Sequence, residues 1–249
     1  MQAPVLVFRP ERKLTLAAAL ALPVLLSLGL WQLDRARQLQ QRWEQQRAVE
    51  AGEAQPVREA MPLPPSAQAL VAHGHYDHPH SILLDNRLRN GRFGHEVLTP
   101  FRLAGSGEHA PALLVNRGWI EGDPARRWLP EIEPIPGQVT LRGRAWHPAP
   151  RRVAAVLPDQ QSWPLVAQWS DLDRLAQRLG HPLLPFVLRL EAGSPGALDV
   201  HWPRATRSPA RHVAYAVQWF GLAAVLVLAW LLASSNAWAW LQARRRRSP

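Results

Sequence analysis

The chain has 249 residues, of which 47% are hydrophobic and 19% charged, a composition that excludes an intrinsically disordered protein. It has no cysteine, which excludes disulfide frameworks, thiolate zinc sites, a cysteine nucleophile and covalent c-type haem attachment. The net charge is +10, but +6 of it lies in two short segments, before residue 14 and at residues 244–247. Basic segments beside apolar runs are typical of membrane proteins. We therefore expect membrane lipid as a partner, and no nucleic acid.

The first apolar run, residues 14–33, contains no charged residue. A helix of that length spans about 30 Å, the thickness of the hydrocarbon core of a bilayer. A cleavable signal peptide is the alternative, but no small-residue cleavage motif closes the run. The helical pattern continues instead to about Gly52. A second uncharged run covers residues 213–243 and predicts a second transmembrane helix.

The flanking charges predict the orientation of both helices. Arg9, Arg12 and Lys13 precede the first run, and four arginines follow the second. The positive-inside rule therefore places both termini in the cytoplasm, whereas the long segment between the runs is translocated. Arginine outnumbers lysine 28 to 1, which favours a bacterial genome and hence the bacterial inner membrane, with a periplasmic main domain. The predicted parts are a cytoplasmic tail (1–13), transmembrane helix 1 (14–33), the periplasmic domain (34–212), transmembrane helix 2 (213–233) and a cytoplasmic basic tail (234–249).

The periplasmic domain is predicted to be mainly β. Short runs of β-forming residues alternate with turn residues after a proline-rich linker. The expected strands cover residues 69–76, 81–85, 95–103, 113–117, 139–146 and 186–191. One helix is expected, with Ser170 as its N-cap, a stripe that includes Leu172 and Leu175, and Gly180 at its end. The fold class is thus a membrane protein in which two transmembrane helices flank a mainly antiparallel β (α+β) extracytoplasmic domain.

The sequence carries no phosphate-binding glycine loop, nucleophile elbow or zinc-protease helix, and we predict that the protein is not an enzyme. Its densest group of metal-ligating side chains is the histidine cluster His73, His75, His78 and His80. On a strand, His73 and His75 share a face roughly 7 Å apart and can converge on Cu(II) or zinc. A solvated turn is the favoured alternative, because Asp77 and Pro79 are turn formers.

Two Asn-Arg pairs follow apolar strands. Asn86-Arg87 ends one strand, and Asn116-Arg117 ends another, with Trp119 two residues later. These five residues predict a shared polar network or an interaction surface for a partner protein. The alternative is that each Asn closes a turn and each Arg pairs locally, for example with Asp85 or Glu121.

The beginning of the second transmembrane helix is the strongest candidate site. His212 stands at the membrane edge, where an ionisable group indicates function. At 100° per residue, His212, Ala216 and Trp219 lie within about 40° of one line, with Tyr215 beside them. A flat apolar ligand can lie on this stripe, and the nearby arginine side chains can pair with acidic groups of that ligand. An interfacial aromatic belt with packing alanines is the alternative.

Six motifs together resemble the SURF1 (Shy1) family of cytochrome c oxidase assembly proteins. They occur in order along nearly the whole chain: GLWQLDR (29–35), GHYD (74–77), LLDNR (83–87), GRFGHEVLTP (91–100), LVNRGW (114–119) and HVAYAVQWF (212–220). The resemblance implies a membrane-bound, non-enzymatic chaperone of the respiratory chain that assists maturation of oxidase subunit I.

The resemblance also implies a cofactor. Bacterial members have been associated with transiently bound haem a, with the histidine that opens helix two as iron ligand, here His212. The expected haem site comprises His212, Tyr215, Ala216, Trp219, Trp31, Arg35 and Arg211. The expected partners are oxidase subunit I and the haem a synthesis machinery. Two other functions stay open: a cofactor-free structural chaperone, and copper delivery by the histidine cluster, although that cluster lacks the Cys or Met ligands that Cu(I) prefers.

Overall fold

The computed structural model describes residues 7–107, 109–148, 162–168, 171–202 and 208–236. The chain folds into two compact units. The first comprises residues Met1–Gln45 and Ala205–Pro249, and the second comprises Gln46–Arg204.

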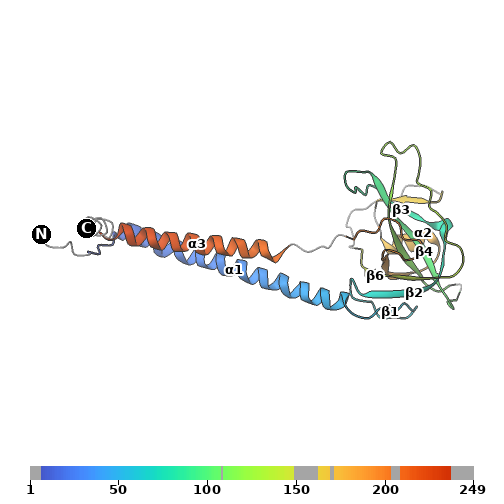
Figure 1. Cartoon of the computed structure of the whole chain (residues 1–249), viewed down its shortest axis with the longest axis horizontal. Helices are drawn as coiled ribbons and strands as arrows, with labels where there is room; N and C mark the ends of the chain where they lie inside the picture. The colour runs from blue at the N-terminus through green and yellow to red at the C-terminus, as the bar shows by residue number, and fades with distance from the viewer. Residues whose placement is uncertain (1–6, 108, 149–161, 169–170, 203–207, 237–249) are drawn as a thin grey trace, which may run out of the picture. The chain divides into compact units, whose positions relative to one another are not determined.

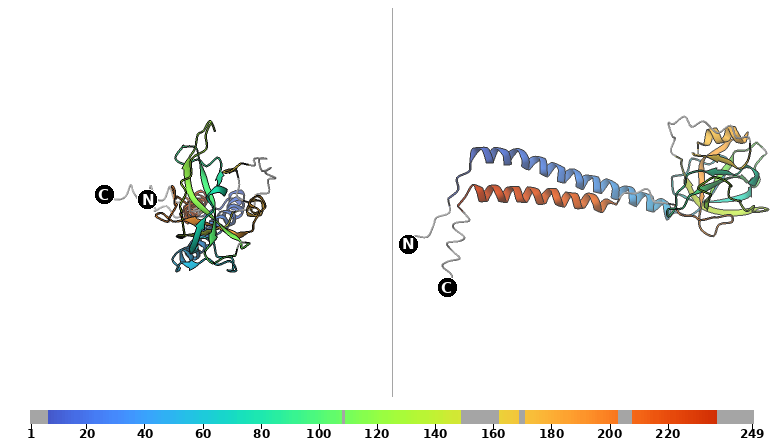
Figure 2. Two further views of the ribbon diagram at one scale, coloured as in Figure 1. Left: turned by 90° about the vertical axis from the view of Figure 1, so that its right-hand side faces the viewer. Right: turned by 90° about the horizontal axis from the view of Figure 1, so that it is seen from above.

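The first unit is a pair of long helices, α1 (Arg12–Glu50) and α3 (Pro209–Ala233), which confirms both predicted apolar helices. The two helices run side by side in Figures 1 and 2. At one end of the pair, the Trp230 indole N–H donates to the Thr15 hydroxyl at 3.1 Å. As predicted, α1 does not end with its apolar run but remains helical to Glu50.

Small residues lie where the two helices meet. The buried residues are Gly29 and Ala36 on α1 and Ala216 and Ala223 on α3. A Cβ atom on Gly29 would lie 2.6 Å from the Phe220 ring, so only glycine permits this approach. Close packing through small residues is typical of helix pairs in membranes.

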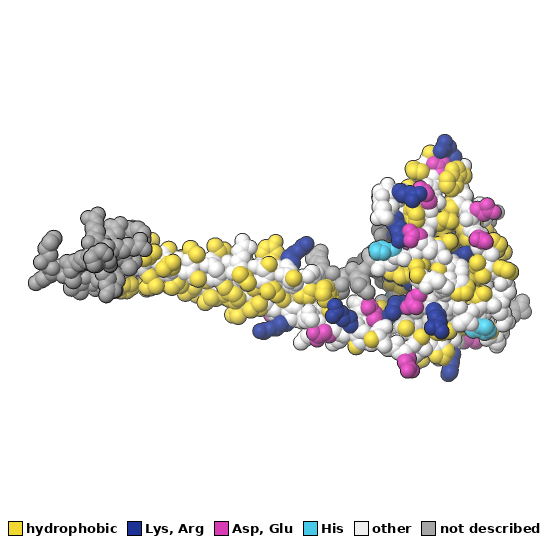
Figure 3. Space-filling model, in the orientation of Figure 1, with side chains coloured by type: hydrophobic (Ala, Val, Ile, Leu, Met, Phe, Trp, Pro, Cys, Tyr) yellow, Lys and Arg dark blue, Asp and Glu magenta, His cyan; other side chains and the backbone are white. Residues whose placement is uncertain are grey.

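Both helices are long and apolar enough to cross a membrane. Only 6% of the apolar window of α1 and 11% of that of α3 is buried, whereas a core helix of a soluble protein is mostly buried. Hydrophobic side chains predominate on the visible surface of the apolar part of the pair in Figure 3, whereas charged side chains lie further along α1. Apolar surface of this extent needs lipid around it, and we conclude that α1 and α3 are membrane-spanning.

The chain segments that flank the helices meet at one end of the pair. The Arg9 amide donates to the Ser234 carbonyl at 2.7 Å, and the Val7 amide donates to the Asn236 side chain at 2.7 Å. The Phe8 ring packs edge-on against Trp230, with 5.6 Å between ring centres. The N-terminal basic residues therefore lie at the end where α3 stops.

The second unit is a β domain with one α-helix. All six predicted strands are present, whereas the two- and three-residue strands β1 and β7 were not predicted. The elements are β1 (Gln55–Pro56), β2 (Ala69–Tyr76), a 3-10 turn η1 (His78–His80), β3 (Ile82–Leu84), β4 (Gly94–Leu103), β5 (Ala112–Glu121), β6 (Val139–Trp146), β7 (Leu165–Ala167), α2 (Leu172–Leu179) and β8 (Leu183–Leu190).

Five strands form a closed ring in the order β2-β6-β8-β5-β4. The ring closes because the end of β4 pairs with the end of β2, with Leu103 opposite Gly74. The ring pairs are antiparallel except β5–β8, which is parallel. Outside the ring, β3 joins β4, β7 joins β3 and β1 joins β2, the last two in parallel.

The domain has two hydrophobic cores. The first takes buried residues from all five ring strands, among them Leu70, Phe101 and Leu188, and therefore fills the interior of the ring. The second joins the outer face of β4, β5 and β8 to β3, β7 and α2, with Leu175 of α2 fully buried.

The N-cap of α2 differs from the prediction. Asp171 caps the helix, since its carboxylate accepts from the Arg174 amide at 3.3 Å. Ser170 lies outside the described residues. Gly180 ends α2 with a left-handed φ of 73°, as predicted.

Candidate functional site

The first turn of α3 carries His212. Ser208 caps this helix and Pro209 begins it, which fixes the turn at its N-terminus. The Nδ1 atom of His212 lies 2.7 Å from the Oε1 atom of Gln32 on α1. An amide oxygen can only accept, so Nδ1 is the donor of this hydrogen bond and, in the neutral imidazole, Nε2 carries the lone pair. The imidazole is thus held in the tautomer that can bind a metal through Nε2.

The side chains around His212 differ in their exposure. Trp31 and Tyr215 are exposed, at 58% and 48%, and Arg211 is also exposed. Trp219 is half-buried, and Arg35 donates to the Gln38 side chain at 3.1 Å.

Ala216 is buried, whereas the sequence predicts it on a surface that faces a ligand. It is 1% exposed and belongs to the helix contact, and therefore offers no open surface to a flat ligand. The exposed aromatic faces near His212 belong to Trp31 and Tyr215 instead.

One residue of each Asn-Arg pair belongs to a polar network in the β domain. Asn86-Arg87 follows β3 as predicted, whereas Asn116-Arg117 lies within β5 and not at its end. Asn116 donates to the Glu96 carboxylate at 2.7 Å, and the other Glu96 oxygen lies 3.7 Å from Nε of Arg87. The Trp119 indole donates to the Arg87 carbonyl at 2.8 Å. The local alternative is wrong about the acidic partners of the arginines.

The two acids named in that alternative pair elsewhere. Asp85 pairs with Arg126, and Glu121 pairs with Arg92. Asn86 takes a left-handed φ of 59° and is exposed, as an asparagine in a turn can be.

Two of the five residues predicted to form an interaction surface are not on the surface. Asn116 is 0% exposed, and its side-chain oxygen accepts from the Gly118 amide. Arg117 is 1% exposed. The prediction is therefore corrected for these two residues. The sequence alone does not distinguish a polar side chain that points to solvent from one that points inward.

Arg117 instead holds two loops against the ring. Its Nε donates to the Gly196 carbonyl at 2.7 Å, and one Nη donates to the Glu133 carbonyl at 3.1 Å. Its guanidinium also lies 5.4 Å from the centre of the Tyr76 ring. Burial lowers the pKa of Arg117 and raises the pKa of Tyr76. These contacts make Arg117 a structural residue of the β domain.

A family model described as the SURF1 family matches residues 19–224. The match includes most of α1, the β domain, the first part of α3 and the His212–Gln32 pair. The chain belongs to the SURF1 family. It is therefore a membrane protein of a family that the six sequence motifs had predicted.

Two curated relatives agree with this assignment. A SURF1-like protein of Monosiga brevicollis is 26% identical over 241 residues, which cover 86% of this chain and 85% of the relative. Cytochrome oxidase assembly protein SHY1 of Saccharomyces cerevisiae is 28% identical over 120 residues. That second match covers 44% of this chain and 28% of the yeast protein.

The histidine cluster of this SURF1-family chain is divided among separate contacts. His73 bonds to the Thr140 hydroxyl at 3.0 Å, and His80 lies 2.8 Å from the Asp77 carboxylate. The Nε2 atom of His78 accepts from the Ile135 amide at 2.7 Å, and burial lowers the pKa of this imidazole. Within the described residues, no three His, Cys, Asp or Glu side chains come together as metal ligands.

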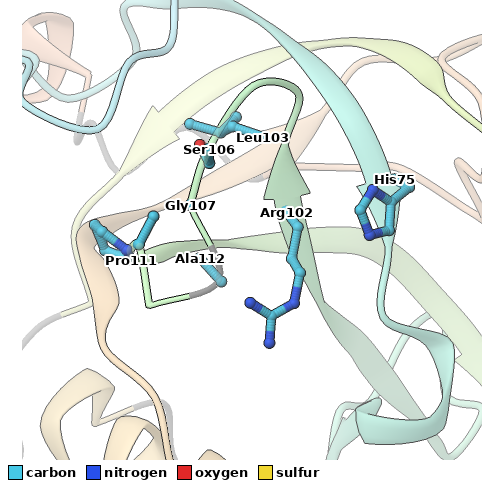
Figure 4. A pocket seen from close by; sticks show the side chains of 8 residues that line it. His75, Arg102, Leu103, Ser106, Gly107, Pro111 and Ala112 are labelled. Carbon is cyan, nitrogen blue, oxygen red and sulfur yellow. The ribbon is translucent and has the colours of Figure 1, made fainter.

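His75 lines a pocket of about 340 Å³ together with the end of β4, the loop after it and the first residue of β5 (Figure 4). Arg102, its direct neighbour across the two strands, also lines this pocket. A guanidinium beside the imidazole repels a divalent cation. The arrangement therefore disfavours a metal at His75.

We expect three of the four histidines to be dispensable. Replacing His73, His75 and His80 together with Gln should change the free energy of unfolding by less than about 1 kcal/mol, because these side chains lie in partly or fully exposed positions. His78→Ala should cost about 1 kcal/mol, since the partly buried Ile135 amide would lose its acceptor. Thermal unfolding of the purified protein measures both effects. A fall in the copper content of the host oxidase in the triple variant would instead show that the cluster handles metal.

Proposed function

We propose that the protein is an assembly factor for cytochrome c oxidase that binds haem a, as cargo, during maturation of subunit I. The supporting comparison is the yeast relative, whose name describes cytochrome oxidase assembly. The supporting observation in this chain is the His212–Gln32 hydrogen bond at 2.7 Å, within a pair of membrane helices. A histidine held in one tautomer at this position is what axial ligation of haem iron requires.

The residues around His212 fit a haem. In the neutral imidazole its Nε2 atom carries the lone pair for iron, because Nδ1 donates to Gln32. The exposed Trp31 and Tyr215 rings supply flat apolar surface, and Arg35 and Arg211 supply cations for the acidic propionates. The chain's part is to hold the macrocycle at the membrane edge, keep it from aggregating and release it to subunit I or accept it from the haem a synthesis machinery.

The test is an absorbance spectrum of the protein purified from cells that make haem a. We expect a Soret band that copurifies with the protein in constant proportion. A spectrum without a haem band, from a protein that still supports oxidase assembly in its host, would favour a cofactor-free structural chaperone instead.

The proposed location is the bacterial inner membrane, with both termini in the cytoplasm and the β domain in the periplasm. The hydrogen bonds of Val7 and Arg9 to Asn236 and Ser234 support a common side for the two termini. Arg9, Arg12 and Lys13 lie beside the first helix, and basic residues favour the cytoplasmic side.

Reporter fusions should confirm this topology. We expect alkaline phosphatase fused after Gly52 to be active, because that point follows helix α1 on the periplasmic side. Green fluorescent protein fused after Pro249 should fluoresce, because it stays in the cytoplasm. Fusions that report the same side of the membrane would overturn the two-span arrangement.

A further inference from the structure

The outer face of the β domain holds an arginine stacked between two tryptophans. The guanidinium carbon of Arg189, on β8, lies 3.9 Å from the ring centre of Trp146 and 4.9 Å from that of Trp202. The Trp202 indole donates to the Leu190 carbonyl at 2.8 Å, which fixes that ring in place. Stacking holds the guanidinium plane and leaves its edge to make hydrogen bonds.

Two arginines at this place each have an Nε donor without a hydrogen-bond partner within the described part of the chain. The Nε atom of Arg189 is buried and has no hydrogen-bond partner there, and the same holds for Nε of Arg87. The distance of 3.7 Å from Arg87 Nε to Glu96 is too long for a hydrogen bond. Buried donors without acceptors are costly. The Arg87 side chain is nevertheless 30% exposed and Arg189 is half-buried, so an acceptor on another molecule can approach these guanidinium groups.

The charges at this place do not balance. Burial lowers the pKa of Arg189 to about 10. The charge of Glu96 acts to raise this pKa, whereas the like charge of Arg87 acts to lower it. Glu96 already accepts from Asn116 through its second oxygen. The neighbouring Arg144 is neutralised by Glu191 at 3.1 Å. Among the described residues, Arg87 and Arg189 therefore share one carboxylate, which leaves an excess of one positive charge there.

We propose that Arg87 and Arg189 form a carboxylate-binding site whose occupant is an Asp or Glu side chain of a partner protein. The flat guanidinium edge matches a carboxylate in two parallel hydrogen bonds. One excess positive charge balances a single carboxylate, and the half-buried Trp146 and Trp202 supply the aromatic surface found at protein-interface hot spots. The site lies entirely within the β domain, so its failure would leave the haem proposal untouched.

The test is an NMR titration of the full chain in detergent micelles, observing the Nε–Hε signals of the arginines. The probes are the peptides acetyl-Ala-Glu-Trp-amide and acetyl-Ala-Gln-Trp-amide, which differ only in the carboxylate, and inorganic phosphate. We expect the Glu peptide to shift the Arg87 and Arg189 signals, with saturation below about 10 mM. Neither the Gln peptide nor phosphate should do so at the same concentration.

Variants show whether these two arginines carry the effect. Arg189→Lys keeps the charge but loses the stacked fork, and should weaken binding of the Glu peptide at least tenfold. Arg142→Lys, an exposed arginine on β6, is the matched control and should bind as the unaltered protein does. If Arg189→Lys does not fold, Arg87→Gln, whose side chain is 30% exposed, gives the same test.

Three results would overturn the proposal. One is the absence of a shift with the Glu peptide, and another is an equal shift with the Gln peptide. The third is a larger shift with phosphate, which would make the site a general anion site rather than a place for an acidic side chain.

Discussion

Arg117→Met should destabilise the β domain by about 3–5 kcal/mol, because two carbonyls lose hydrogen bonds to a charged donor, each worth about 1.5–3 kcal/mol. The variant removes the donors of two hydrogen bonds, so that the carbonyls of Gly196 and Glu133 lose their charged partner. It also removes the cation that lies over the Tyr76 ring, at a side chain that is only 1% exposed. The loops that carry Glu133 and Gly196 would then lose their hydrogen bonds to β5. Thermal unfolding followed by near-ultraviolet circular dichroism measures the effect.

The control for this prediction is Arg142→Met. Arg142 is an exposed arginine on β6, so the same chemical change there should alter stability by less than about 0.5 kcal/mol. Arg117→Lys should be intermediate, because an ammonium keeps the charge but is not the planar fork that serves two carbonyls at once. A melting temperature of Arg117→Met equal to that of Arg142→Met would show that the buried guanidinium contributes nothing net to stability.

The β domain was predictable where strands are long enough to carry a pattern. The strands β2 and β6 begin and end where the sequence predicts, because buried and exposed residues alternate along them and turn residues bound them. The strands β1 and β7 have two and three residues and carry no pattern of their own. Each exists because a neighbouring strand pairs with it, and such pairing is not visible in a local sequence window.

The candidate site was predictable as a place but not as a set of contacts. His212 was recognised because an ionisable residue at the edge of an apolar run is unusual. Its partner Gln32 is 180 positions away, and the contact depends on how α1 and α3 pack. One signal was present: Gln32 is the only amide side chain in the uncharged run 14–33. The prediction for Ala216 was wrong because the packing of α1 against α3 is not visible in the sequence, and small residues line a helix contact as readily as a ligand site.

His212→Ala should remove most of the haem from the purified protein. The substitution takes away Nε2, the proposed iron ligand, and leaves only the aromatic surface of Trp31 and Tyr215 to hold the ring. The melting temperature of the β domain should not change, because its two cores contain no residue of α3. Oxidase assembly in the host should fall without vanishing, since some affinity remains without the iron bond. The measurement is the Soret band of both proteins at matched protein concentration.

Gln32→Leu separates a ligand from a merely packed histidine. It leaves His212 in place but removes the acceptor at 2.7 Å that fixes the Nδ1–H tautomer. Loss of such a hydrogen bond to a ligating histidine costs about tenfold in affinity, and we expect haem retention to fall by about that factor with an altered Soret position. Gln41→Leu, an exposed glutamine further along α1, is the matched control and should retain haem as the unaltered protein does. A Soret band of unchanged intensity and position in both His212→Ala and Gln32→Leu would remove His212 as the ligand, because no iron bond would then depend on it.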